Sequence, residues 1–115
     1  MQFQTDMSSP HKDLFLSARA LLLSVEGITE IRKERITTYK NEWGSICHMR
    51  TMSHGIDVGF LKGARMEDGL GLLQGDGKTM RVLPLEEMNE PAMMYYLSQA
   101  FLLNRANVAR QRAIA

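Results

Sequence analysis

The spacing of apolar residues changes twice along this chain, and that change constrains the fold more than any other feature. Between residues 9 and 27, Leu14, Ala18, Leu22 and Val25 recur every three to four positions, whereas between residues 28 and 60 the apolar positions alternate. A period near 3.6 places side chains on one face of a helix, and a period of two places them on one face of a strand. The helical period returns after residue 89. The pattern predicts a helix, an antiparallel sheet and a second helix.

Local signals at both ends of residues 9–27 support the first helix. Ser9 followed by Pro10 is typical of an N-cap and first helical position, and Gly27 is suited to a left-handed C-terminal stop. Residues 1–8 are polar and aperiodic, and we expect a flexible N-terminal tail there. The 115 residues then form one domain over residues 9–115.

Turn residues divide the central region into strands. Runs of β-branched and apolar residues at 36–39, 46–52 and 56–60 predict strands, with turns at residues 41–44 and 54–55. Residues 80–85 resume this character, and Pro84 marks an edge strand or a strand end. The segment 28–35 fits either a strand or a further helical turn. The sheet therefore has four to six strands.

The last helix begins at residues 89–91, and Met93, Leu97, Ala100, Phe101 and Val108 share one of its faces. Two amphipathic helices and a meander of strands are most simply assembled with both helices on one face of the sheet. The expected fold class is α+β in two layers.

Charge and cysteine content exclude several classes of function. Fourteen Lys and Arg against thirteen Asp and Glu leave a net charge of +1, which gives no support to nucleic-acid or membrane binding. No apolar segment is long enough to span a bilayer, and no secretory signal begins the sequence. The single cysteine, Cys47, cannot form an internal disulfide, so we expect a cytoplasmic protein.

A glycine-rich segment is the candidate binding site. Six of the nine glycines lie between residues 59 and 77, and a loop this long in a small domain is often functional. Backbone N–H groups and nearby cations could converge there on a small anion. The candidate ligand-binding residues are Lys62, Gly63, Gly75, Gly77, Lys78 and Arg81. The ordinary alternative is that these glycines only form tight turns.

Catalytic motifs are weak by comparison. Gly77-Lys78-Thr79 lacks both the first glycine and the following helix of a phosphate-binding loop. Cys47 and His48 are adjacent, and on a strand they would face opposite sides of the sheet. No catalytic residue is predicted, and a binding protein is favoured over an enzyme.

Two stretches of the sequence carry a family resemblance. They are Val58-Gly59-Phe60-Leu61-Lys62-Gly63-Ala64 and, after Glu67-Asp68, Leu72-Leu73-Gln74-Gly75-Asp76-Gly77-Lys78-Thr79-Met80-Arg81. This pattern resembles the YdhG-like family of bacterial domains of unknown function. The resemblance implies a helix, an antiparallel sheet and a C-terminal helix, similar to frataxin, and an uncharacterised binding or accessory protein.

One branch of that family is described as a frataxin-like iron chaperone, which gives an alternative function in iron homeostasis. Under this alternative the metal-binding carboxylates are Asp13, Glu26, Glu30 and Glu34, and iron is the bound metal. Otherwise no cofactor is assigned. The expected partner is an unidentified small anionic ligand. Tyr39 and Trp43 near one turn, and Tyr95 and Tyr96 on the last helix, are candidate exposed anchors for a homodimer.

Overall fold

The computed structural model describes residues 1–114, and its elements follow the predicted order. They are α1 (Gln2–Met7), α2 (Lys12–Ser24), β1 (Thr29–Arg32), β2 (Thr37–Asn41), β3 (Gly44–Met52), β4 (Gly55–Phe60), the 3-10 turn η1 (Gly63–Arg65), β5 (Arg81–Leu85) and α3 (Glu90–Ile114). The fold is α+β, as expected. Within residues 1–114, no helix is both long and apolar enough to cross a membrane.

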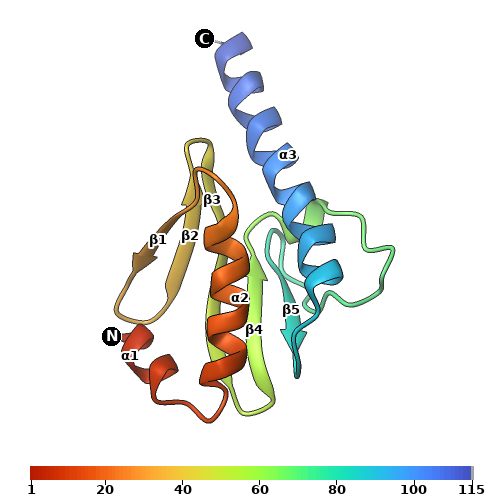
Figure 1. The fold of residues 1–115 in the computed structure, drawn as a ribbon. Helices are drawn as coiled ribbons and strands as arrows, with labels where there is room; N and C mark the ends of the chain where they lie inside the picture. Colours follow the sequence, from red (N-terminus) through yellow and green to blue (C-terminus); the bar gives the residue numbers. More distant parts are fainter. Residues whose placement is uncertain (115) are drawn as a thin grey trace.

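The five strands form one antiparallel sheet in the order β1-β2-β3-β4-β5. Helices α2 and α3 lie over the same face of this sheet (Figure 1). The alternation along each strand decides which side chains lie under the helices. Tyr39, Cys47 and Phe60 face one another across β2, β3 and β4 and are fully buried in the core. The ring of Phe60 packs against Tyr96 of α3, with ring centroids 5.9 Å apart.

The ambiguous segment 28–35 contains a strand. β1 pairs with β2 through residues 29–32, because the β-branched Ile31 and Thr29 fit a pleated ladder. Both predicted turns are confirmed, since β3 begins at Gly44 and β4 at Gly55. At Gly55 φ is +149°, and an added Cβ would lie 2.0 Å from the carbonyl oxygen of Leu85. Only glycine fits there.

The expectation of a loose tail over residues 1–8 is wrong. Residues 2–7 form α1, and Phe3 and Asp6 are buried. The ring of Phe3 packs edge-on against Phe15 of α2. Asp6 accepts hydrogen bonds from the backbone N–H and the hydroxyl of Thr51, at 2.9 and 2.7 Å. These long-range contacts, rather than any local pattern, order the N-terminus.

The helix predicted from Ser9 begins three residues later, at Lys12, although the Ser9 hydroxyl oxygen still accepts a hydrogen bond from the N–H of His11 at 3.0 Å. On α2, Phe15 joins Ala18 and Leu22 in the core. The predicted face of α3 is buried through Ala100 but not at Val108, because the helix runs past the sheet (Figure 1).

Candidate ligand-binding site

The glycine-rich segment is a loop held in place by Asp68. One carboxylate oxygen of Asp68 accepts hydrogen bonds from the N–H of Leu72, at 3.1 Å, and from the hydroxyl of Tyr96 on α3. The other oxygen accepts the N–H of Leu73 at 3.3 Å. These bonds, first of all that from Tyr96, lower the pKa of Asp68, while burial and the bond to Asp68 raise the pKa of Tyr96 to about 12. The loop is therefore anchored to the helix layer.

Four of the six predicted site residues meet at the end of this loop. Gly63 lies against Arg81, because an added Cβ on Gly63 would be 2.5 Å from the Cβ of Arg81. The guanidinium of Arg81 donates hydrogen bonds to the carbonyl oxygens of Gly77 and, at 2.9 Å, of Met80. Gly75 is also adjacent to the Arg81 side chain. Arg81 thus binds carbonyl groups of its own loop.

The two lysines of the predicted site, Lys62 and Lys78, make no hydrogen bond to the residues around Arg81. The ammonium of Lys62 donates a hydrogen bond to the side-chain oxygen of Asn104, which is buried on α3. Burial, together with the nearby Arg65, lowers the pKa of Lys62. Lys78 is exposed on the loop. Since Arg81 and Lys62 already have partners, the loop offers few cationic donors to an added anion.

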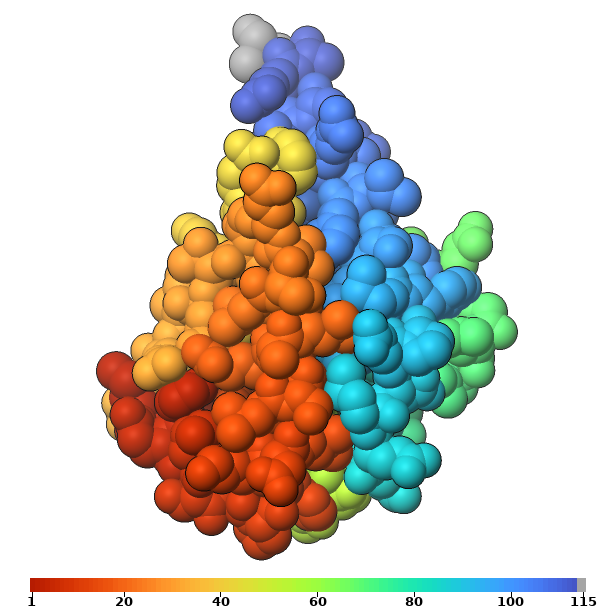
Figure 2. All heavy atoms as spheres, viewed as in Figure 1, coloured from red at the N-terminus to blue at the C-terminus, as the bar shows by residue number. Residues whose placement is uncertain are grey.

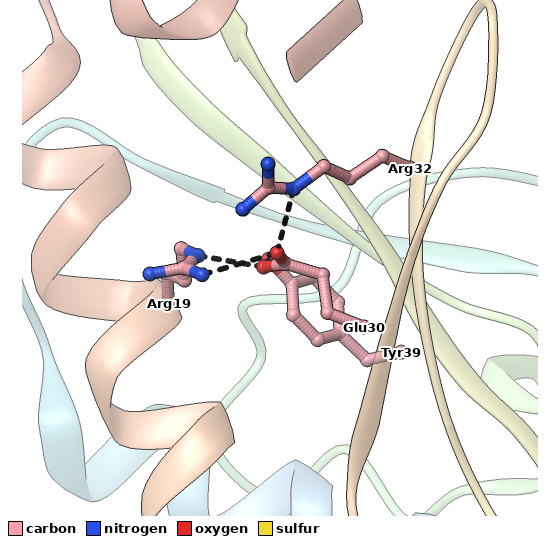
Figure 3. Close-up of polar contacts among 4 residues, drawn as sticks. All are labelled: Arg19, Glu30, Arg32 and Tyr39. Carbon is pink, nitrogen blue, oxygen red and sulfur yellow. Dashed lines mark hydrogen bonds and ion pairs between the residues drawn. The ribbon is translucent and has the colours of Figure 1, made fainter.

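Glu30 has a structural role that does not suit an iron ligand. Its carboxylate accepts hydrogen bonds from Arg19 at 2.6 and 3.1 Å, from Arg32 at 3.0 Å and from the Tyr39 hydroxyl at 2.9 Å (Figure 3). Burial acts to raise the pKa of Glu30, but these donors outweigh it and the pKa is lowered. Arg32 also lies over the ring of Phe3, 3.6 Å from its centroid. The cluster ties α1, α2, β1 and β2 together.

The carboxylates of the iron alternative do not converge. Over residues 1–114, no group of three or more His, Cys, Asp or Glu side chains is placed to hold a metal ion. Glu26, Glu30 and Glu34 would share a face only on a helix, whereas residues 29–32 are strand. Asp13 lies in the first turn of α2. The predicted set is therefore divided among separate elements.

The face of the sheet opposite α2 and α3 carries a different site. The strand register places Thr38, His48, Gly59 and Val82 side by side on this open face. Because Gly59 has no side chain, Met80 can lie over it, and an added Cβ would be 3.4 Å from the Met80 sulfur. A surface pocket of about 280 Å³ results, which we call the open-face pocket. It is lined by Arg35, Ile36, His48, Arg50, Asp57, Gly59, Met80 and Val82.

Charge in the open-face pocket is unbalanced toward the positive. Arg35 and Arg50 are exposed at its rim. Its carboxylate, Asp57, is 2.8 Å from the imidazole of His54, which lies outside the pocket lining. Burial and the nearby Lys33 lower the pKa of His48, so its imidazole is neutral at pH 7 and can donate or accept a hydrogen bond. Two arginines therefore line the pocket together with the apolar side chains of Ile36, Met80 and Val82.

Cys47 does not contribute to this site. As its position next to His48 predicts, it points to the other face of the sheet, and it is fully buried. Burial raises the pKa of its thiol well above the usual range. A thiol that stays protonated and buried is a poor nucleophile, so this residue gives no support to an enzymatic mechanism.

A larger surface pocket, of about 750 Å³, lies between the α1–α2 turn and the β3–β4 turn. Five of its nine lining residues are Ser or Thr, and its one titratable side chain, His11, bonds to the carbonyl oxygen of Ser53 at 3.0 Å. Apolar surface combined with a few charged groups is the usual composition of a ligand site. The smaller open-face pocket fits that description better.

Sequence reasoning did not find the open-face pocket, because its residues come from three separated segments, 35–36, 48–59 and 80–82. The alternation of residues along β3 did indicate part of the pocket. It places His48 and Arg50 on the same side of β3, opposite Cys47 and Met49.

In comparisons with known proteins, no family model, no curated protein and no solved structure matches the chain.

Proposed function

We propose that this chain is a binding protein rather than an enzyme, and that its ligand is a small molecule with an anionic group and a short apolar body. The observation that carries the proposal is the open-face pocket, which Arg35 and Arg50 line together with Ile36, Met80 and Val82. Guanidinium groups are the donors best suited to a carboxylate or phosphate, and the apolar side chains accommodate the rest of the molecule.

The size of the pocket restricts the ligand further. About 280 Å³ is close to the lower end of the range for small-molecule sites, roughly 300 to 1,000 Å³. A single ring or a short alkyl chain with one carboxylate fits this volume. Neutral His48 adds one directional hydrogen bond, and its ring is itself positioned by Thr38, whose hydroxyl lies 3.3 Å from Nδ1.

The proposal extends to the family. We propose a YdhG-like domain with a frataxin-like arrangement, supported by the order of elements and by the glycine motif that leads into β5. Met80, the residue before the last of that motif, forms part of the open-face pocket, so the motif also shapes the proposed site. A bacterial origin and a cytoplasmic location belong to the same proposal, and the single free cysteine supports the cytoplasmic location alone.

Calorimetric titration of the full chain tests the ligand class. Benzoate and hexanoate combine a carboxylate with an apolar body, benzyl alcohol has a similar ring without the charge, and inorganic phosphate has the charge without the body. We expect binding of the two carboxylates, and binding at least tenfold weaker for the alcohol and for phosphate. Equal affinity for benzyl alcohol and benzoate would contradict the anionic part of the proposal.

A matched pair of variants tests the location. Arg50→Gln removes a rim cation, and Arg65→Gln removes an exposed arginine of η1 that lies outside the pocket lining. Loss of one charge-assisted hydrogen bond costs about 1.5 kcal/mol, so benzoate affinity should fall about tenfold in Arg50→Gln. Arg65→Gln should bind as the unaltered protein does. Equal affinities for both variants would place the ligand elsewhere.

A further inference from the structure

The C-terminal half of α3 extends beyond the rest of the molecule. Ala92, Met93, Tyr96, Leu97, Ala100 and Asn104 of this helix are buried, and Asn104 is the last of them. Residues 105–113 are exposed or half-buried, and Figures 1 and 2 show this end projecting past the sheet and α2. A helical segment of this length is only marginally stable in water without a packing partner. Apart from Arg105, which lies over the Trp43 ring, the projecting end therefore has few of the packing contacts that hold the first half.

An apolar seam runs along the outward side of α3. Leu102 is 67% exposed, the highest value among the large hydrophobic side chains of residues 1–113. Ala106, Ala109 and Ala113 follow at intervals of four, three and four residues, which is the spacing of one side of a coiled-coil helix. The buried residues Leu97 and Asn104 lie on the opposite side of the helix. Leu102 thus stands at the N-terminal end of an uncovered stripe.

Beside the N-terminal part of this stripe lies a surface hollow. It has a volume of about 550 Å³ and lies between η1 with the start of the loop and α3. Its lining is Arg65, Glu67, Tyr95, Ser98, Gln99, Leu102 and Leu103. Two hydrogen bonds hold the backbone of Glu67 there. Its N–H donates to the side-chain oxygen of Gln99 at 2.7 Å, and its carbonyl oxygen accepts from the side-chain NH₂ of Gln99 at 2.9 Å. The hollow and the projecting half of α3 meet at Leu102.

Charge is distributed oppositely at the two ends of α3. Three exposed carboxylates surround its start, and they are Glu86, Glu87 and Glu90. Three exposed arginines occupy its second half, and they are Arg105, Arg110 and Arg112, with no acidic residue after Glu90. Two such helices attract each other when they run antiparallel and repel when they run parallel.

From the hollow, the stripe and this charge pattern, we propose that α3 pairs antiparallel with α3 of a second copy of the chain, crossing at Leu102. In such a pair residue 102+n lies against residue 102−n of the partner, and the two contacts are identical by twofold symmetry. Leu102 meets Leu102. The small Ala106 and Ala109 then lie against Ser98 and the bulky Tyr95, beside the hollow.

The same register pairs the charges. Arg112 comes to the first turn of the partner helix, where Glu90 is exposed. Arg105 instead lies over Trp43 of its own chain, 5.7 Å from the ring centroid. The ion pair of Arg112 with Glu90 occurs twice in the dimer. The partner covers the projecting half of α3. The projecting half of the partner's α3 in turn fills the hollow between η1 and α3. The second copy therefore supplies the packing that the single chain lacks.

Light scattering after size-exclusion chromatography tests the proposal on the full chain. We expect a mass of twice 13.1 kDa that falls toward 13.1 kDa on dilution and in high salt. Leu102→Glu should be monomeric at concentrations where the unaltered protein is dimeric. Leu70→Glu changes another exposed leucine, 47% exposed in the loop, and should remain dimeric. A monomer at every concentration would overturn the proposal, and so would a dimer that Leu102→Glu leaves unchanged.

Engineered cysteines test the direction of pairing, because the native Cys47 is buried. In a glutathione redox buffer Leu102→Cys should form an intermolecular disulfide. Ala113→Cys should not, since antiparallel helices place the two positions about 33 Å apart at 1.5 Å per residue. Efficient cross-linking of Ala113→Cys would indicate parallel helices and overturn the proposed geometry.

Charge reversal supplies a third test. Arg112→Glu should weaken the dimer at least tenfold, and the added Glu90→Arg should restore it.

Discussion

Replacement of Glu30 by glutamine tests the cluster that joins α1 and α2 to the edge of the sheet. The Glu30 side chain is only 9% exposed and accepts hydrogen bonds from Arg19, Arg32 and Tyr39 (Figure 3). Each of its two oxygens accepts from two donors. In Glu30→Gln one oxygen becomes an NH₂ group, which is itself a donor and faces donors on either side.

The magnitude follows from the exposure of the partners. Hydrogen bonds to a charged group contribute about 1.5–3 kcal/mol each when buried, but Arg19 and Arg32 are 28% and 44% exposed, and water can replace part of what they lose. The hydroxyl of the buried Tyr39 has no such access. We expect the free energy of unfolding to fall by about 2 kcal/mol at pH 7, which lowers Tm by about 8 °C for a chain of this size.

The pH dependence of the effect identifies its cause. The pKa of Glu30 is lowered in the folded state, so the charged cluster stabilises the fold above the unfolded value of 4.5. That stabilisation is lost as the pH falls from 4.5 through the lowered folded pKa. Urea unfolding of both proteins should therefore show a difference in free energy that is constant near neutrality and shrinks below pH 4.5.

Glu26→Gln is the matched control, because Glu26 is exposed and lies in the turn before β1. It should change the free energy of unfolding by less than about 0.5 kcal/mol. Equal stability of Glu30→Gln and Glu26→Gln would contradict a stabilising role for the Glu30 cluster. A difference between Glu30→Gln and the unaltered protein that persists unchanged at pH 3 would contradict the role of the Glu30 charge.

Three further outcomes are expected. Gly55→Ala should destabilise the fold by about 3 kcal/mol in urea unfolding, because its Cβ would collide with the Leu85 carbonyl oxygen, and a loss below about 1 kcal/mol would contradict the turn geometry. Asp68→Asn should lower the phenol pKa of Tyr96 from about 12 toward its ordinary value, as followed by ultraviolet absorbance, and an unchanged titration would argue against their hydrogen bond. The Cys47 thiol should react with a disulfide reagent only at the rate of unfolding, because it is buried and burial raises its pKa; fast reaction of the native protein would show an accessible thiol.

The periodicity of apolar residues predicted most of the architecture, because each helix and strand of a two-layer fold must bury one face and therefore repeats its apolar residues at the period of that element. Helices α2 and α3, the two hairpin turns and the placement of Cys47 and His48 on opposite faces of β3 all follow from spacing. Helix α1 could not be predicted in this way. Its one large apolar anchor, Phe3, is buried through Phe15 and Arg32, which are distant in sequence.

The glycine-rich loop was located correctly, but the use of its charges was not evident from sequence. Arg81 donates to backbone carbonyl groups, and Lys62 donates to Asn104, which is 42 residues away. The local sequence around Arg81 or Lys62 indicates neither of these hydrogen-bond partners. The open-face pocket depends in the same way on strand register, which brings Gly59 next to His48 and Val82.

Mapping benzoate onto the protein by NMR tests the central proposal most directly. Amide resonances of the ¹⁵N-labelled full chain are followed during titration with benzoate and, separately, with benzyl alcohol. The account predicts saturable shifts at Ile36, His48, Gly59 and Val82 with benzoate, much weaker ones with the alcohol, and none of comparable size at residues 75–78. Shifts confined to residues 75–78 would assign the anion to the glycine-rich loop, and no saturable shift on the open face would contradict a ligand site there.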